Sequence, residues 1–205
     1  MGKFGQIVIL NGAPRSGKSS IATEILGNFV GNWVSLGVDN TMQAMPDSLR
    51  PGIGLRPGGE RPELEEYIVS SYGELYKTIR VQSLLGINVV VDVGHHDNYS
   101  KPLGILPRCL NILKGLPVML VGVRCALPEI LARRALTPSD YLSSQDGQPV
   151  PAPILLWQKA VHVPGVYDLE VETSTATPAE CADSIAAFLN GNTLSAAAAT
   201  IMAAK

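Results

Sequence analysis

The sequence has little charge, and its positive and negative charges nearly balance. Charged residues make up 17% of the 205 residues, and the formal net charge is −2. A general nucleic-acid binder normally has a basic field, so this balance argues against that class of protein. Apolar residues make up 46%, which indicates a globular chain and not a disordered one. Such a composition suits a protein that acts on a small molecule, without identifying the molecule.

Cysteine and long apolar runs are also scarce. The three cysteines, Cys109, Cys125 and Cys181, are odd in number and have no CxxC spacing. We interpret them as reduced thiols of a cytoplasmic protein, two or three of them buried, and a metal site built from them is not expected. No apolar stretch reaches membrane-spanning length, and the N-terminal run is too short for a signal peptide, so no membrane association is predicted.

Apolar runs rich in β-branched residues alternate with helical patterns along the chain. Strand, helix, strand, helix predicts an α/β fold with a parallel sheet and helices on both faces, that is, three layers. Several strands read as continuous apolar segments, which is typical of strands buried on both faces. The predicted strands are residues 6–11, 33–38, 88–93, 117–124 and 169–173, and the predicted helices are 18–27, 62–85, 128–136 and 178–189.

Three segments interrupt this alternation. Residues 50–62 are rich in Gly and Pro and are predicted to be a loop. Residues 137–153 follow a strand and helix at the place where small kinases have a mobile lid, although this segment contains no Arg or Lys. Residues 193–205 are mostly Ala, Ser and Thr, a tail that could be disordered, helical or foreign to the natural chain. One domain over residues 1–192 is therefore expected.

A phosphate-binding loop follows the first predicted strand. The GxxxxGK[ST] pattern lies between a strand and an amphipathic helix, which is the context this motif requires. Two glycines allow backbone conformations that a Cβ would resist, and the loop N–H groups and the helix N-terminus face anionic oxygens. Lys18 would bind the β- and γ-phosphates of ATP, and the Ser19 hydroxyl would bind Mg²⁺. The residues concerned are Gly12, Ala13, Pro14, Arg15, Ser16, Gly17, Lys18, Ser19 and Ser20.

Two carboxylates end neighbouring apolar runs, and both are candidates for the same site. In an open parallel sheet, ligands gather at the carboxyl ends of the strands, so Asp39 and the phosphate loop are expected to face one another. Asp39 either accepts the proton of an attacking hydroxyl or caps the following helix, and both roles stay open from position alone. Asp92 follows three valines, a pattern typical of the carboxylate that orders Mg²⁺, with a turn-forming Asp as the alternative.

Histidines and arginines supply further candidates. His95 and His96 are adjacent, so on an extended segment they point to opposite sides and cannot easily chelate one ion. We predict an exposed loop there, near the acceptor pocket. Arg133 and Arg134 lie on the helix after the fourth strand, where they either reach the triphosphate or form a solvated face. An ion pair of Arg133 with Glu129 is also expected from their spacing of four.

The chain resembles the chloramphenicol phosphotransferase family, a branch of the small P-loop kinases, up to about Asn190. The resemblance implies a five-stranded parallel sheet, transfer of the ATP γ-phosphate to a hydroxyl of a small molecule, Asp39 as the base, and a family arginine at Arg133. In the founding members the acceptor is the primary alcohol of chloramphenicol. The matching pieces are Ile9-Leu10-Asn11-Gly12, Ser16-Gly17-Lys18-Ser19, Leu36-Gly37-Val38-Asp39, Ala44-Met45-Pro46, Val121-Gly122-Val123-Arg124-Cys125, Val161-His162 and Gly165-Val166-Tyr167-Asp168-Leu169-Glu170-Val171-Glu172-Thr173.

Three functions are therefore weighed. The first is a kinase for a small hydroxylated acceptor that uses ATP and Mg²⁺, with Asp39, Lys18 and Arg133 as catalytic residues. The second is a nucleotide-dependent switch or slow NTPase without such an acceptor. The third, a kinase for nucleic-acid ends or a nucleotide sugar, is disfavoured in its nucleic-acid form by the low net charge. A homo-oligomer is expected only if apolar side chains on the predicted helix 62–85 are exposed.

Overall fold

A single five-stranded sheet organises the molecule, in which every neighbouring pair of strands is parallel. The computed structural model describes residues 4–43, 45–136, 149–191 and 195–204. The strand order is β2-β3-β1-β4-β5. The predicted parallel sheet is confirmed, and each strand end lies within a residue of its predicted position. The strands are β1 (Ile7–Asn11), β2 (Trp33–Gly37), β3 (Asn88–Val93), β4 (Val118–Arg124) and β5 (Leu169–Glu172).

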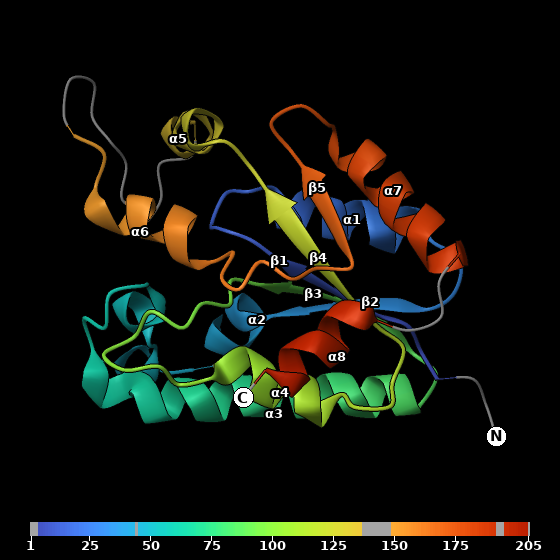
Figure 1. Ribbon diagram of the computed structural model, residues 1–205, viewed down its shortest axis with the longest axis horizontal. Helices are drawn as coiled ribbons and strands as arrows, with labels where there is room; N and C mark the ends of the chain where they lie inside the picture. Colours follow the sequence, from blue (N-terminus) through green and yellow to red (C-terminus); the bar gives the residue numbers. More distant parts are fainter. Residues whose placement is uncertain (1–3, 44, 137–148, 192–194, 205) are drawn as a thin grey trace.

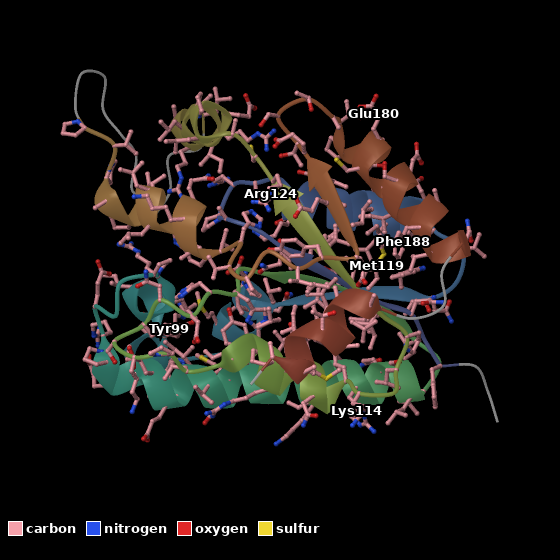
Figure 2. All side chains as sticks on the ribbon, viewed as in Figure 1. Tyr99, Lys114, Met119, Arg124, Glu180 and Phe188 are labelled. Atoms are coloured by element: carbon pink, nitrogen blue, oxygen red, sulfur yellow. The ribbon has the colours of Figure 1, made fainter. Side chains whose placement is uncertain are left out.

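Helices cover both faces of this sheet, as Figure 1 shows. One face carries α1 (Lys18–Asn28) and α7 (Pro178–Gly191), and the other carries α3 (Glu65–Leu84), α4 (Ile105–Ile112) and α8 (Ala196–Ala203). Because successive side chains of a strand point to opposite faces, Ile7 and Ile9 pack on the α3 side while Val8 and Leu10 pack on the α1 side. Side chains fill the space on both sides of the sheet (Figure 2).

The long helix α3 confirms its predicted apolar stripe. Its buried residues include Ile68, Tyr72, Leu75, Tyr76 and Ile79, which recur at helical spacing. Burial of each such side chain contributes roughly 1.5–3 kcal/mol relative to exposure, so the stripe holds α3 against the sheet. That anchoring fixes Tyr72 and Tyr76 beneath the carboxyl end of the sheet.

Short elements gather around the carboxyl ends of the strands. The segment between β2 and α3 contains α2 (Val38–Gln43) and the 3₁₀ turns η1 (Asp47–Leu49), η2 (Gly52–Leu55) and η3 (Pro62–Leu64). After β4 come α5 (Leu127–Ala135) and α6 (Ala152–Ala160), which lie at the same end of the sheet in Figure 1. Open parallel sheets bind ligands at this end.

Three of the described helices were not among the predicted elements. Helix α2 starts directly after β2, α4 contains Pro107, and α6 contains Pro153 in its first turn, so none shows a clean helical signal. The predicted lid lies largely on residues 137–148, which are outside the described residues, and its end at residues 152–153 begins α6.

The described part of the C-terminal tail is helical and belongs to the packed core. The carboxylate of Asp168 accepts hydrogen bonds from the Ser195 hydroxyl at 2.5 Å and from the Ala197 N–H at 3.0 Å. It also accepts one from the Leu120 N–H at 2.8 Å, so one side chain ties α8 to β4. Of the options that the sequence left open for this tail, the helical one describes residues 196–203.

In the described residues, no single helix has the length and apolar character of a membrane span. Helices α7 and α8 pass that test only when counted together, and they meet at an angle of 84°.

Candidate active site

The phosphate loop connects β1 to α1 with a backbone that its glycines make possible. The Gly12 N–H donates to the Val93 carbonyl at 3.3 Å, and the Ser16 N–H donates to the Ala13 carbonyl at 3.1 Å. A Cβ on Gly12 would lie 2.5 Å from the Val123 carbonyl oxygen, and Gly17 has a φ of 93°. Both glycines are therefore required by the loop geometry, as the sequence predicted. Arg15, with φ 70°, is a left-handed residue in the same turn.

Lys18, Ser19 and Asp92 form a polar cluster at the mouth of the loop. The Lys18 ammonium donates to the Ala13 carbonyl at 3.0 Å and lies 3.4 Å from a carboxylate oxygen of Asp92. The Ser19 hydroxyl donates to the other oxygen of that carboxylate at 2.7 Å. Lys18 is only 8% exposed, and its contact with Asp92 of β3 helps to hold the lysine in place. The structure thus brings together the three residues that the sequence assigned to phosphate and metal.

The donors in this cluster fit Mg²⁺. Mg²⁺ prefers oxygen ligands and is usually bound by one or two protein groups together with substrate phosphates and waters. Ser19 offers a hydroxyl and Asp92 a carboxylate, with their oxygens 2.7 Å apart beside the phosphate loop. Within residues 4–43, 45–136, 149–191 and 195–204, no group of three or more His, Cys, Asp or Glu side chains could enclose a metal ion. The site therefore suits an ion shared with a bound phosphate.

Asp39 faces this cluster from the start of α2, two residues after the end of β2. Helix α2 begins at Val38, so Asp39 lies in the first helical turn and is not the residue that caps it. Gly37 permits the approach, because a Cβ there would lie 2.8 Å from the Asp92 carbonyl oxygen. Burial raises the pKa of the Asp39 carboxyl, the charge of Asp92 raises it further, and Lys18 lowers it. Asp39 is thus within electrostatic reach of both Asp92 and Lys18.

One cavity of about 870 Å³ connects these groups. This volume lies within the usual range for ligand sites, about 300–1,000 Å³. Its wall combines the phosphate loop with residues of α2, η2, α3, α5 and α6. The lining includes Gly12, Pro14, Arg15, Gly17, Lys18, Ser19, Ser20, Val38, Asp39, Met42, Leu55, Arg56, Tyr72, Asp92, Arg133, Arg134, Ile154, Trp157 and Thr173.

Arg133 lines the cavity and also braces the phosphate loop. Its guanidinium donates to the Arg15 carbonyl at 3.3 Å, to the Thr173 hydroxyl at 3.2 Å and to the Thr173 carbonyl at 2.7 Å. The expected ion pair with Glu129 is present at 2.9 Å. Arg134 is 6% exposed, so the alternative of a solvated helix face does not describe this residue. Arg133 is positioned to hold the loop and to contribute positive charge beside it.

Replacing Arg133 by lysine is expected to lower kcat/KM for ATP by about 10- to 100-fold, although the charge is kept, because a lysine cannot reproduce the planar fork that spans Arg15 and Thr173. Steady-state kinetics with varied ATP measure this effect. Lys159→Arg, a change on α6 outside the cavity lining, serves as the control. A lysine variant as active as the wild type would show that only the charge matters.

The prediction of an exposed loop at His95 and His96 is wrong. The two residues are 3% and 4% exposed. The His95 ring shares a hydrogen bond of 2.8 Å with the Tyr76 hydroxyl and lies 4.6 Å from the ring of Tyr72, and burial lowers the pKa of His95 to about 3. The reason is that α3 supplies tyrosines over the strand end, which removes this segment from solvent.

His96 supports the opposite wall of the cavity. Its Nδ1 accepts from the Asn98 N–H at 3.2 Å, so its Nε2 carries the proton and donates to the Leu55 carbonyl at 3.0 Å. The ring meets Trp157 edge-on at 5.1 Å and stacks near Tyr99, which Figure 2 labels on the segment after β3. The two histidines therefore hold lining residues such as Tyr72, Leu55 and Trp157 in place.

Sequence reasoning missed two supporting residues. The Asn11 side chain accepts from the His95 N–H at 2.6 Å and donates to the Val161 carbonyl at 2.9 Å, which joins β1 to the chain after α6. The Thr173 hydroxyl donates to the Ser16 carbonyl at 2.7 Å. Both lie at or just beyond the carboxyl end of a strand, a positional signal that could have drawn attention to them.

The sequence profile of chloramphenicol phosphotransferase-like proteins matches residues 5–190. The chain belongs to this family. Membership in the family supports nucleotide binding and phosphotransfer of the kinase type. A search among curated proteins finds no significant match.

Solved kinase structures share the fold of this family member. Shikimate kinase from Aquifex aeolicus has 18% identity and a TM-score of 0.57, with 91% of this chain and 98% of that chain covered. Thymidylate kinase from Candida albicans has 15% identity and a TM-score of 0.58, with 94% of each chain covered. APS kinase from Mycobacterium tuberculosis, solved with AMPPNP and APS, has 15% identity and a TM-score of 0.56, with 92% and 99% covered. Identities this low establish a common P-loop kinase fold and nothing about the acceptor.

Proposed function

We propose that this chain transfers the γ-phosphate of ATP to a hydroxyl group of a small molecule. The observation that carries the proposal is the placement of Asp39 in the same cavity as Lys18 and the phosphate loop. Asp39 comes from the strand-end segment next to β3, so it faces the loop from the acceptor side. A carboxylate facing a phosphate-binding loop puts a proton acceptor beside the phosphorus that would be attacked.

The loop side would bind and polarise the triphosphate. The N–H groups of the loop and the start of α1 face the phosphate oxygens, and Lys18 supplies positive charge as the transferred group develops negative charge. Ser19 and Asp92 would hold Mg²⁺, which neutralises phosphate charge when bound. Arg133 links the phosphate loop to the residue that follows β5, because its guanidinium donates both to the Arg15 carbonyl and to Thr173. Most of the acceleration would come from positioning and electrostatics.

The acceptor side would orient and deprotonate the hydroxyl. Asp39 accepts the proton as the acceptor oxygen forms a bond to the γ-phosphorus, and the bond from that phosphorus to the β–γ bridging oxygen breaks. Because burial and Asp92 raise the pKa of Asp39, it is a stronger base than an exposed aspartate would be. Its role as base matches the role that the family resemblance gives to this residue.

The cavity favours an acceptor over a nucleotide switch. Beyond Asp39 the wall continues through Met42, Leu55 and Tyr72, a lined space that a slow NTPase without an acceptor would not require. The net charge of −2 supports a small acceptor and not a nucleic acid.

A homo-oligomer is also proposed, since Val81, Leu84 and Leu85 at the end of α3 are exposed.

Acceptor-dependent ADP release tests the proposal. Purified protein with ATP and Mg²⁺ is screened against small alcohols, each paired with its methyl ether, which differs by one methyl group and has no hydroxyl to phosphorylate. We expect at least one alcohol to stimulate ADP formation while its ether does not. A slow ADP release that no alcohol increases would instead favour the switch or slow NTPase.

A further inference from the structure

Arg56 lies on the acceptor side of the cavity and follows the turn η2 directly. Its N–H donates to the Ile53 carbonyl at 2.9 Å, which closes the turn and fixes the start of the side chain. The side chain is partly buried and lines the cavity together with Asp39 and Leu55. The position of this arginine is therefore set by the fold and is not that of an exposed loop residue.

Arg56 differs from its neighbours in having no side-chain partner among the residues that the structure describes. Arg50 pairs with Asp47 at 2.8 Å and also donates to the Met42 and Met45 carbonyls at 3.1 Å, and Arg61 pairs with Glu63. The Arg56 guanidinium makes no hydrogen bond, ion pair or ring contact with any residue that the structure describes. Asp39 and Asp92 share the cavity, yet neither forms an ion pair with it. A partly buried charge without a partner is costly, so it points to a partner that arrives with a ligand.

The nucleotide does not account for this arginine. Four other basic side chains, Arg15, Lys18, Arg133 and Arg134, line the part of the cavity formed by the phosphate loop and α5. Arg56 instead comes from the segment between β2 and α3, next to the residues of α2. Its charge is thus placed for the acceptor and not for the triphosphate.

The rest of the acceptor side is mainly apolar, with Thr41 and Ser71 as polar residues of its lining. Val38, Met42, Leu55 and Tyr72 line this cavity and also a small adjoining hollow of about 20 Å³, whose wall continues through Met45, Ile68 and Leu75. In such apolar surroundings a guanidinium binds an oxyanion more strongly than it would in open water, and its planar fork fits two oxygens at once. An acceptor that fits has an apolar body between its hydroxyl and its anionic group.

We propose that Arg56 binds an oxyanion of the acceptor, so that the acceptor class is a hydroxylated compound with a carboxylate or a sulfonate-like group. The inference rests on the phosphotransferase function proposed above. Arg56 is then a specificity-determining residue, and the Asp39 carboxylate and the Arg56 guanidinium mark the two ends of the acceptor site.

Binding of matched compounds tests this assignment independently of turnover. The protein is loaded with ADP and Mg²⁺, and dissociation constants are measured by calorimetry for para-hydroxymethyl benzoate, the corresponding sulfonate and the corresponding neutral amide. The same series is repeated with aliphatic hydroxy acids and their amides. We expect oxyanions to bind at least about 10-fold more tightly than amides, because a hydrogen bond between two charged groups is stronger than one to a neutral amide. The carboxylate and sulfonate arms identify which oxyanion is preferred.

Variants at two arginines supply the decisive comparison. Arg56→Gln is expected to abolish the preference for oxyanions and to leave ADP affinity unchanged, whereas Arg61→Gln, in the same segment but already paired, keeps it. Equal binding of acids and amides by the wild type, retention of the preference in R56Q, or failure of every oxyanion to bind would overturn the assignment. Oxyanions that bind through Arg56 without being phosphorylated would instead contradict the proposed function alone.

Discussion

Replacing Lys18 by methionine is expected to lower kcat on the order of 10³-fold, the range seen when a charge-stabilising group is removed from a transition state. The lysine is nearly buried and held between the Ala13 carbonyl and Asp92, so its ammonium is already positioned before nucleotide binds. Methionine keeps the unbranched apolar stem but supplies no charge for the transferred phosphate. Single-turnover kinetics with saturating ATP measure the effect.

Two observations separate a catalytic loss at Lys18 from a structural one. Loop contacts that do not involve the Lys18 side chain remain, such as Ser16 N–H to Ala13 and Gly12 N–H to Val93, so the thermal midpoint of Lys18→Met should stay close to that of the wild type. Lys18 also lowers the pKa of Asp39, so the variant should need a higher pH for its residual activity. A variant with unaltered kcat would remove Lys18 from the mechanism.

Replacing Asp39 by asparagine is expected to reduce acceptor phosphorylation by about 10²- to 10⁴-fold, the usual contribution of a positioned general base. The amide has the same shape but cannot take the proton. ATP affinity and any slow hydrolysis should change little, because the loop side of the cavity is untouched. The matched control is Asp47→Asn, since Asp47 is highly exposed in the next element and pairs with Arg50 on the protein surface. Equal transfer rates for Asp39→Asn and the wild type would exclude the base role.

The pH dependence of Asp39 has a definite sign. Burial first, and then Asp92, raise its pKa above the ordinary value of 3.8, so the acidic limb of kcat/KM should lie above that value. Between the ordinary and the raised pKa the native state binds more protons than the unfolded state, so this group makes the fold less stable as pH rises through that window. Asp39→Asn should therefore lose the acidic limb of the rate profile while its thermal midpoint at neutral pH rises. A fall in that midpoint would show that Asp39 is a structural residue.

The sheet and the phosphate loop could be predicted because their signals are local. Strands buried on both faces are continuous apolar runs, and the loop has fixed glycines between a strand and a helix. The acceptor side could not be predicted, since it depends on contacts between distant residues. His96 reaches the Leu55 carbonyl and the edge of Trp157, and His95 is covered by Tyr72 and Tyr76 of α3. The residues adjacent to the two histidines in the sequence do not predict those partners.

The roles of polar residues were predictable only in part. The sequence assigned Ser19 to Mg²⁺ from the loop motif and Asp92 to the same ion from its position at a strand end. The two side chains do form a hydrogen bond. For Arg133 the sequence suggested contacts with phosphate or with solvent. In the structure its guanidinium instead donates to the Arg15 carbonyl and to the hydroxyl and carbonyl of Thr173. Position along a helix does not reveal which carbonyls the fold will bring within reach.

The fate of the γ-phosphate tests the central claim most directly. The protein is incubated with γ-labelled ATP, Mg²⁺ and each hydroxyl compound that stimulates ADP release, and the labelled products are separated and identified by mass spectrometry. The account predicts that the label appears as a phosphate monoester of the acceptor, in amounts equal to the extra ADP formed, and that this product is largely lost in Asp39→Asn. Recovery of all the label as inorganic phosphate, whatever compound is present, would contradict it.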